Sequence, residues 1–391
     1  LGLDKESAFA AIVEGKCGIK QIGLFDTEKH SVKIAGEITD FDPSTVLDAK
    51  EVKKADRFIQ LGMKAAQEAM DDAKIPEGTD RDRFGIVSAS GIGGLPNIEK
   101  NAVINEKRGP RRISPFFIPS SLVNMLGGFI SIYQELRGPN LSAVTACAAG
   151  THAIGEAAKS IMVGTADKML VVGAEAAICE VGIGGFAAMK ALSTRNDDPQ
   201  TASRPFDRDR DGFIMGEGAG ALVLETYEDA VARGATIYAE LIGFGESGDA
   251  SHITSPSMDG PLRAMQMAYK MAGEPKIDYV NAHGTSTPAN DKNETAALKE
   301  LFGSKESCPP VSSIKGQIGH CLGAAGAIEA VTCLMAMRDG VLPPTINYTI
   351  PDEDCDLDYI PNEARKAELS VVMSNSFGFG GTNGVVIFKK V

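Results

Sequence analysis

The stretch Leu141-Ser-Ala-Val-Thr-Ala-Cys147 runs directly into an alanine- and glycine-rich segment, Ala148 to Val163. A second stretch has the same order of features, because Val311-Ser-Ser-Ile-Lys315 leads through a glycine-rich turn into the small-residue segment Cys321 to Met337. In each case a short apolar run precedes a turn with a reactive side chain and then a helix of small residues. The pattern indicates two halves built on one plan, although any α/β protein also repeats strand, turn and helix.

Further strand candidates lie on either side of these two units. Short apolar runs of this kind suit strands that helices cover on both faces. The predicted strands are Phe84 to Ala89, Met169 to Gly173, Ala219 to Glu225, Tyr238 to Phe244, Tyr279 to Ala282 and Gly384 to Phe388. The segment Arg57 to Ala73 has the periodicity of a helix. We therefore expect an α/β fold with halves at residues 1–234 and 235–391.

The two halves do not begin alike. The second begins near Ala235 with a strand, whereas the chain opens directly on a predicted helix, Lys5 to Glu14. If the halves are duplicates, an N-terminal strand is missing from the first, together with its turn a segment of roughly fifteen to twenty residues. We expect this to leave a central position of the first sheet open.

Composition excludes several classes of protein. The 391 residues are 43% hydrophobic and 23% charged, which rules out a disordered, collagen-like or disulfide-scaffold chain. The formal net charge of −13 argues against a general nucleic-acid or anionic-membrane binder. Neither a membrane-length apolar stretch nor a signal-peptide pattern is present in the sequence, so we expect a cytoplasmic protein. The seven cysteines include no CxxC pair, so reduced thiols are expected.

Cys147 is a candidate nucleophile. It lies where a strand-like run meets a helix, among alanines and a glycine that leave its approach open. A helix N-terminus lowers a thiol pKa and presents backbone N–H groups to an oxyanion. A buried structural thiol is the alternative interpretation, since this is the commoner fate of a cysteine among alanines.

Two of the five histidines lie at strand and helix junctions. His283 follows a predicted strand, and His320 comes before a helix, five residues after Lys315. Junctions at the carboxyl ends of strands are where α/β proteins place ligands. Structural histidines are the alternative, and a zinc site is disfavoured because the sequence gaps match no zinc spacing and Lys315 would add a positive charge.

The segment Ser374 to Gly384, with sequence SNSFGFGGTNG, is rich in glycine and carries Phe377 and Phe379. Such a loop can bring backbone N–H groups close to a substrate and move an aromatic gate. It is a weak candidate for a phosphate loop, because no Lys-Ser/Thr follows and the next element is a strand. A plain hairpin turn is the other interpretation.

Four motifs in order resemble one family. They are VTACAAGTHAIGEA at 144–157, YVNAHGTSTPANDKNE at 279–294, VSSIKGQIGHCLGAAGAIEA at 311–330 and SNSFGFGGTNG at 374–384. Together they resemble the β-ketoacyl-[acyl-carrier-protein] synthases, the elongating condensing enzymes of fatty-acid synthesis, over nearly the whole chain. The GIGG at 91–94 and the segment 193–213 look most like the type II members. The resemblance implies a thiolase-like five-layer α-β-α-β-α fold of two pseudo-duplicated halves, without a cofactor.

The resemblance also implies roles for individual residues. Cys147 would carry the acyl chain as a thioester, while His283 and His320 promote decarboxylation of malonyl carrier and stabilise the enolate. Two neutral imidazole N–H groups can supply the donors that an enolate oxygen needs. Lys315 would orient His320 and its surroundings. The backbone N–H groups of Cys147 and Phe379 would form the oxyanion hole.

Further residues carry over from the family by position. Thr285 and Thr287 resemble hydrogen-bonding partners of the pantetheine arm, and Thr254 resembles a guide for it. The acyl pocket would be walled by Ile92, which limits its depth, by Phe186 and, across a homodimer, by Phe117. Phe377 and Phe379 resemble a gate. Asn281 and Glu329 resemble contributors to a structural cation site of some members.

The implied partner is an acidic acyl carrier protein, whose docking would need a local basic patch. The candidates are Lys53, Lys54, Arg57, Arg108, Arg111, Arg112 and Lys190. A charge cluster can equally be a plain solvated face. One departure from the family lies beside these motifs, because Gly316 and Ile318 stand where many members have polar residues.

Three other functions share this kind of sequence. A thiolase needs a second cysteine near its C-terminus, but none follows Cys355. A polyketide ketosynthase module usually differs in the segment around His283. A non-catalytic chain-length factor lacks the nucleophile, so the presence of Cys147 together with both histidines argues against it.

Overall fold

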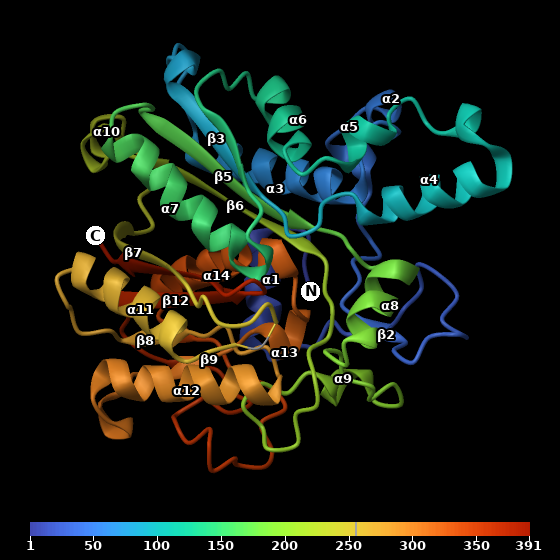
Figure 1. Cartoon of the computed structure of the whole chain (residues 1–391). Coiled ribbons are helices and arrows are strands. Elements are labelled where there is room, and N and C mark those ends of the chain that lie inside the picture. The colour runs from blue at the N-terminus through green and yellow to red at the C-terminus, as the bar shows by residue number, and fades with distance from the viewer. Residues whose placement is uncertain (255) are drawn as a thin grey trace.

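The computed structural model describes residues 1–254 and 256–391 and contains two central β-sheets (Figure 1). The first sheet has the strand order β4-β3-β5-β6, and the second has the order β7-β13-β12-β8-β9. The strands of the first sheet are β3 (Phe84–Ala89), β4 (Asn140–Ala143), β5 (Lys168–Glu175) and β6 (Gly218–Glu225). Those of the second are β7 (Glu240–Gly248), β8 (Tyr279–Asn281), β9 (Val311–Ser312), β12 (Val371–Gly378) and β13 (Thr382–Lys389).

The two sheets share one pairing pattern. In the first, β3 is parallel to β4 and β5, and β5 is antiparallel to β6. In the second, β8 is parallel to β9 and β12, and β12 is antiparallel to β13. Four strands of each sheet therefore correspond, which is the internal similarity that the sequence indicated.

The strand without a counterpart is β7, an edge strand that pairs with β13. The expectation of an open central position in the first sheet is wrong, because β4, β3, β5 and β6 are contiguous. Among the described residues, β4 and β6 each leave one edge of the first sheet unpaired, and the edge of β6 is the one that corresponds to the β13 edge covered by β7. A cavity of ≈ 750 Å³ lies along this edge, between helices α1 and α3 and residues 235–241. The additional N-terminal strand itself stays a prediction.

Helices form three layers around the sheets. The central layer is α7 (Ala149–Met162) and α14 (Ala325–Asp339), each of which contacts both sheets (Figure 1). On the outer face of the first sheet lie α3 (Arg57–Ala73) and α6 (Met125–Tyr133). On the second sheet lies α11 (Asp259–Met271), with α12 (Pro288–Phe302) beside it. The five-layer arrangement expected from the sequence is confirmed.

Small residues let the two central helices approach closely. A Cβ atom on Gly150 of α7 would come within 2.6 Å of the Ala327 nitrogen of α14, and one on Gly326 would come within 2.5 Å of the Thr151 nitrogen. Real Cβ atoms do not make contacts this short. The alanine- and glycine-rich composition that marks both helices is therefore a packing requirement of the central layer.

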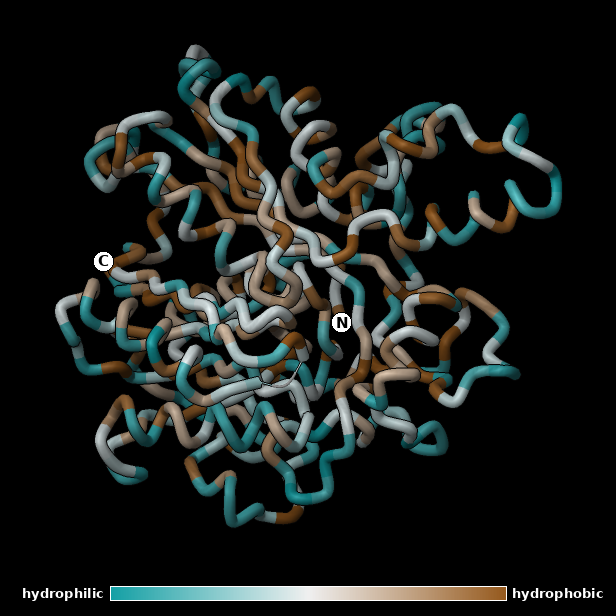
Figure 2. The backbone as a smooth tube through the Cα atoms, viewed as in Figure 1, coloured by the Kyte–Doolittle hydropathy of each residue, from teal (hydrophilic) through white to brown (hydrophobic). Residues whose placement is uncertain are grey.

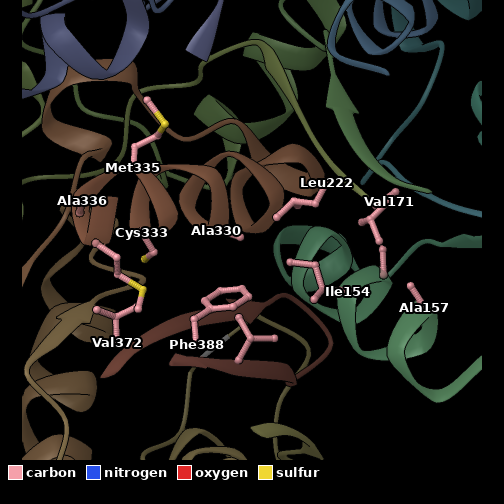
Figure 3. Close-up of a cluster of buried hydrophobic side chains, with 14 of the residues drawn as sticks. Ile154, Ala157, Val171, Leu222, Ala330, Cys333, Met335, Ala336, Val372 and Phe388 are labelled. Atoms are coloured by element: carbon pink, nitrogen blue, oxygen red, sulfur yellow. The ribbon is translucent and has the colours of Figure 1, made fainter. Parts of the chain in front are cut away.

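The main hydrophobic core lies around this layer. Figure 2 shows that hydrophobic residues are frequent along the strands and that hydrophilic residues are frequent in the peripheral loops. Figure 3 shows the side chains that fill the space between the central helices and the two sheets, among them Ile154, Val171, Leu222, Cys333, Val372 and Phe388. Tight packing of this core fixes the turns at the ends of both helices, where the predicted catalytic residues lie.

The remaining elements are short or peripheral. The helices are α1 (Lys5–Val13), α2 (Ala49–Val52), α4 (Leu95–Arg108), α5 (Phe117–Ser121), α8 (Glu180–Ala188), α9 (Pro199–Ala202), α10 (Tyr227–Ala232) and α13 (Lys315–Ile318). The short strands are β1 (Lys20–Gln21), β2 (Ile34–Ala35), β10 (Val341–Leu342) and β11 (Arg365–Lys366). The 3-10 turns are η1 (Pro43–Thr45), η2 (Arg81–Arg83), η3 (Pro110–Arg112), η4 (Ala146–Ala148), η5 (Lys305–Ser307) and η6 (Leu322–Ala324). Among the described residues, no helix has both the length and the apolar character needed to cross a membrane.

Candidate active site

The predicted nucleophile lies in a tight turn at the start of α7. Cys147 is the middle residue of η4, and Ala146 before it has a φ of 49°, which is unusual for a residue other than glycine. The Thr145 carbonyl accepts hydrogen bonds from the Ala148 nitrogen at 3.1 Å and from the Thr382 hydroxyl at 3.0 Å. The second of these bonds ties the turn of the first half to strand β13 of the second.

The two histidines lie beside one another in the second half. His283 follows β8, and His320 comes just before η6 at the start of α14. Their ring centroids are 5.3 Å apart with the planes at 83°, and both side chains are buried. The Nδ1 atom of each ring is buried without a hydrogen-bond partner in the described structure. Such unsatisfied groups are rare in folded proteins and suit a site that a substrate or water completes.

The charge state of both rings follows from their surroundings. Burial lowers the pKa of His283 well below its usual value, and the nearby charges of Lys315 and His320 lower it further. Burial followed by Lys315 has the same effect on the pKa of His320. Both imidazoles are therefore neutral at neutral pH and can donate a hydrogen bond without carrying a charge.

The thiol of Cys147 departs from the sequence-based expectation. Burial raises its pKa to about 12, and this outweighs the lowering by Lys315 and by the backbone N–H groups of Phe379 and Cys147. The expectation that the helix end gives the resting thiol thiolate character is wrong, because desolvation of the anion is the larger effect. The same two N–H groups are those expected to form the oxyanion hole, and they lie close enough to the sulfur to affect it.

Lys315 is paired with Glu329 inside the protein. Its ammonium group donates to Glu329 Oε1, and both side chains are 1% exposed or less. Burial raises the pKa of Glu329, and the charge of Lys315 opposes this. The other carboxylate oxygen, Oε2, is buried without a hydrogen-bond partner in the described structure, as is Oδ1 of Asn281. Orphaned oxygens of this kind fit the ligand set of a monovalent cation.

Aromatic side chains link the gate to the histidines. Phe379, 36% exposed, lies at the turn between β12 and β13, 6.3 Å from the ring of Phe186. Phe186 contacts Phe213, which in turn contacts His320, each pair at 5.4 Å between centroids. Phe377 is buried in β12, 5.5 Å from His283. The glycine-rich segment is thus a hairpin turn and also part of the site, so its two interpretations hold together.

The remaining pocket and arm residues divide into two groups. Ile92 and Phe186 pack against the apolar cluster that contains Cys147, whereas Phe117 belongs to α5 and is absent from that cluster. Thr285 and Thr287 share a hydroxyl–hydroxyl contact of 2.9 Å just after His283. The Thr254 nitrogen donates to His252 Nδ1 at 3.1 Å, and the adjacent Ile253 carbonyl accepts from Gly380 of the gate turn.

The proposed docking cations are not all available. Arg57 donates to both carboxylate oxygens of Glu217, at 2.8 and 2.7 Å, and to the Ile38 carbonyl. Its side chain is only 26% exposed. The prediction that Arg57 belongs to a docking surface is therefore wrong, because its guanidinium group is already paired inside the protein. Lys54 pairs with Glu51 and lies 5.6 Å from the centre of the Phe116 ring. The exposed candidates are Lys53, Arg108, Arg111, Arg112 and Lys190.

Two buried carboxylates of the site were missed from the sequence. Glu294 of α12 accepts from the backbone N–H groups of His283 at 2.9 Å and Gly284 at 2.8 Å, and it fixes this turn. Burial raises its pKa to about 7. Glu175, at the end of β5, accepts hydrogen bonds from the turn that carries Ile92. Neither residue has a local sequence pattern that marks it as a buried acceptor.

Comparisons with known proteins cover the whole chain. The family model "Beta-ketoacyl synthase, N-terminal domain" matches residues 1–230, and "Beta-ketoacyl synthase, C-terminal domain" matches residues 238–349. A curated relative, 3-oxoacyl-[acyl-carrier-protein] synthase 2 of Coxiella burnetii, is 50% identical over 396 residues, which is 100% of this chain and 96% of the relative.

Solved structures agree with this assignment. A β-ketoacyl synthase from Burkholderia phymatum has a TM-score of 0.93 and 34% identity over 99% of this chain and 96% of its own. A ketosynthase solved with its type II polyketide acyl-carrier protein has a TM-score of 0.90 and 32% identity over 100% of this chain and 96% of its own. With both domain models and relatives of this similarity, the chain belongs to the β-ketoacyl synthase family.

Proposed function

We propose that this enzyme is an elongating 3-oxoacyl-[acyl-carrier-protein] synthase of fatty-acid biosynthesis, an acyltransferase that lengthens an acyl chain by two carbons. The observation that carries this proposal is the set formed by Cys147 before α7, the neighbouring neutral rings of His283 and His320, and Lys315, whose charge acts on all three. This set can both form a thioester and stabilise an enolate. A curated relative that is 50% identical, and of which this chain covers 96%, is a 3-oxoacyl-[acyl-carrier-protein] synthase 2.

The first half-reaction is acyl transfer to Cys147. The sulfur bonds to the acyl carbon of acyl carrier, the carrier's thiolate leaves, and the Cys147 proton passes to that thiolate. Because burial raises the pKa of the Cys147 thiol, the sulfur gives up its proton during attack rather than beforehand. The N–H groups of Cys147 and Phe379 bind the tetrahedral oxyanion that forms on the way.

The second half-reaction forms the carbon–carbon bond. Malonyl carrier loses CO2, and the enolate oxygen that results accepts hydrogen bonds from His283 and His320. The enolate carbon attacks the acyl thioester, and the Cys147 sulfur leaves as a thiolate and takes up a proton. Burial holds both imidazoles neutral, and the nearby charge of Lys315 adds to this effect. Loss of CO2 drives the step, so the reaction needs no cofactor.

A two-step mass measurement tests this function. The intact mass is recorded after a medium-chain acyl carrier is added and again after malonyl carrier is added. We expect an acyl adduct on Cys147, then its loss together with a product two carbons longer. A Cys147→Ala variant is the matched control and forms no adduct. Absence of the adduct in the wild type would point to a non-catalytic, chain-length-factor-like subunit.

The acyl carrier protein docks, we propose, on the exposed cations around η3 and the ends of α4 and α8. They are Lys53, Arg108, Arg111, Arg112 and Lys190, and the half-buried Lys54 lies next to Lys53. Figure 1 shows α2, α4 and α5 gathered on one side of the molecule, with α8 below them. An overall charge of −13 repels an acidic partner except at such a patch. The solved ketosynthase in complex with its carrier protein supports the partner class.

The enzyme forms a homodimer, we propose, through the exposed edge of β4. This edge pairs with no further strand among the described residues. Exposed apolar side chains surround it, including Ile118, Leu122, Ile132, Leu141 and Val144. A free strand edge beside an apolar patch favours a second copy. In that arrangement Phe117 of one subunit would reach the acyl pocket of the other.

Two further proposals concern the surroundings of the site. Asn281 and Glu329 hold a monovalent cation through their otherwise unpaired oxygens, which would offset the cost of leaving them buried.

The second of these proposals is that the enzyme works in the cytoplasm, where thiols stay reduced. In support, all seven cysteines are free thiols in the structure.

A further inference from the structure

The buried carboxylate of Glu175 has an unusual set of partners. Its Oε1 accepts from the Ser90 hydroxyl at 2.8 Å and from the backbone N–H groups of Ile92 at 3.2 Å and Gly93 at 3.3 Å. Its Oε2 accepts from the N–H groups of Gly91 at 2.5 Å and Gly323 at 3.0 Å. Five donors therefore converge on a side chain with no exposed surface. Burial raises the pKa of this carboxyl, and the hydrogen bonds from the surrounding donors oppose that shift.

These donors come from two distant turns. Gly91 to Gly93 follow β3 in the first half, and Gly323 belongs to η6, three residues after His320. The two turns touch through their backbones, because a Cβ atom on Gly323 would come within 2.1 Å of the Gly91 nitrogen. Without a shared anion, N–H groups from both turns would face one another without acceptors. Glu175 is the group that lets them meet.

One of these turns carries Ile92. That side chain packs against the apolar cluster that contains Cys147. Under the proposed function, it forms part of the wall that an acyl chain on the sulfur meets. Burial largely fixes Glu175 at the end of β5, where it pairs with β6 opposite Gly218. The position of Ile92 relative to Cys147 is thus set by hydrogen bonds to a rigid strand end, as well as by packing.

We propose that Glu175 is a positioning residue that sets the depth of the acyl pocket, and hence chain-length selectivity, by holding the Ile92 turn against the His320 turn. This inference rests on the proposed function, since it assigns a role in the binding of the acyl chain. Glu175 makes no contact with reacting atoms. Its influence passes through Ile92 on one side and Gly323 on the other.

Replacement of Glu175 by glutamine should affect one of the two turns more than the other. The amide nitrogen of Glu175→Gln prefers the Oε1 position, because there the Ser90 oxygen can accept a hydrogen bond from it. The N–H group of Ile92 then faces a donor, and that of Gly93 keeps only its bond to the Ser90 hydroxyl oxygen at 3.1 Å, whereas Gly91 and Gly323 keep their acceptor. The variant therefore releases the Ile92 turn selectively. Loss of such a bond to a charged group has effects large enough for us to expect about a fivefold change in selectivity.

The test compares elongation of eight-carbon and fourteen-carbon acyl carriers. We expect Glu175→Gln to raise the ratio of kcat/KM for the longer to the shorter chain about fivefold, because the depth limit is relaxed. Decarboxylation of malonyl carrier, which does not use the acyl pocket, stays within about twofold of wild type. Glu37→Gln is the matched control, because buried Glu37 also accepts backbone N–H groups, from Gly23 and Leu24, but none from the turn that carries Ile92.

A double-mutant cycle makes the proposal specific. If Glu175 acts through Ile92, Ile92→Ala removes the depth limit, and adding Glu175→Gln to it changes the chain-length ratio no further. Additive effects, or an equal loss for both chain lengths, would overturn the proposal. Should Glu175→Gln fail to fold, Ser90→Ala removes one donor and shifts the ratio in the same direction. A wild-type enzyme that elongates neither chain would instead refute the proposed function itself.

Discussion

At the residue scale, we expect a single substitution in the buried pair of Lys315 and Glu329 to cause the largest loss of folding stability. Removing the lysine leaves a carboxylate in the core without its counter-charge, and breaking such a pair costs about 3–5 kcal/mol. We expect Lys315→Ala to lower the free energy of unfolding by about this amount at pH 8, measured with urea. The double variant Lys315→Ala, Glu329→Gln should recover most of the loss. Equal instability of both variants would contradict a role for the unpaired charge.

The neutrality of the two histidines gives a prediction about pH. Their folded-state pKa values are lowered well below the usual value of 6.5 for histidine, so protonation of the folded enzyme starts well below that pH. We expect the rate of malonyl decarboxylation to be flat between pH 8 and about pH 6. Stability should fall as the pH drops below about 6.5, because the unfolded state then binds protons that the folded state does not. A fall in the decarboxylation rate near pH 6.5 would contradict this, because it would mean that the two histidines have ordinary pKa values.

Residue type and glycine context marked Cys147, His283 and His320 as candidates, but they left a structural role open for each. The family resemblance supplied their catalytic roles and those of Lys315 and Phe379, and these roles stay predictions. The buried acceptors Glu175 and Glu294 were missed, because a single acidic residue in a strand or helix has no local pattern that announces burial. The direction of the Cys147 pKa was wrong for the same reason, since desolvation depends on neighbours far away in the chain.

At the element scale, helix α3 begins at an unusual cap. Asp56 accepts from the Phe58 nitrogen at the N-terminus of α3, and the Asn97 nitrogen of α4 also lowers its pKa. Burial nevertheless raises that pKa to about 6. A carboxyl with a raised folded-state pKa loses stability as the pH rises from its unfolded value to its folded value, so the penalty is complete above about pH 6.

Replacing that cap should therefore stabilise the enzyme at neutral pH. Asparagine caps a helix as well as aspartate but carries no charge. We expect Asp56→Asn to raise the free energy of unfolding at pH 7.5 by up to about 3 kcal/mol, and to change it little at pH 4. Urea titrations at the two pH values measure this. A gain of equal size at both would mean that charge burial is not the cause.

Elements with strong local signals were predicted within a few residues, and others were not. Arg57–Ala73 and Phe84–Ala89 have the predicted ends, because Asp56 caps the helix and the strand is uniformly apolar. The glycine-rich segment became the ends of β12 and β13, so only its turn is a loop. The predicted start of α14 was too early because the chain first forms η6, which packs against Gly91. Tertiary contacts of that kind leave no periodic trace in the sequence.

At the scale of the whole molecule, the sequence predicted the two-sheet plan but not the position of the strand without a counterpart. Repeated small-residue helices indicated the duplication, since each must pack between two sheets. Strand order is decided by which edges meet in space, so the sequence placed the unmatched position in the centre, whereas β7 is at an edge. The burial of Arg57 could not be predicted for the same reason, because its partner Glu217 is 160 positions away in the sequence.

The dimer proposal predicts that one charged substitution at the β4 edge separates the subunits. Leu141 is 50% exposed there, and a lysine would bring two like charges together across a two-fold contact. We expect Leu141→Lys to give a monomer by light scattering and to lose most elongation activity, because Phe117 no longer reaches the partner's pocket. Met267→Lys, at an exposed apolar position on α11, is the control and stays dimeric. A wild-type monomer would refute the proposal.

Docking of the carrier protein can be separated from chemistry by changing only the form of the substrate. Arg111 and Arg112 are exposed in η3, and reversing both to glutamate turns an attraction for an acidic carrier into a repulsion. We expect KM for carrier-bound substrates to rise about tenfold or more at low salt, with less effect at high salt. KM for pantetheine analogues should not change, since they reach Cys147 without touching η3. Lys276→Glu, whose side chain is 90% exposed on another surface, is the matched control. Equal effects on both substrate forms would place the two arginines outside the docking surface.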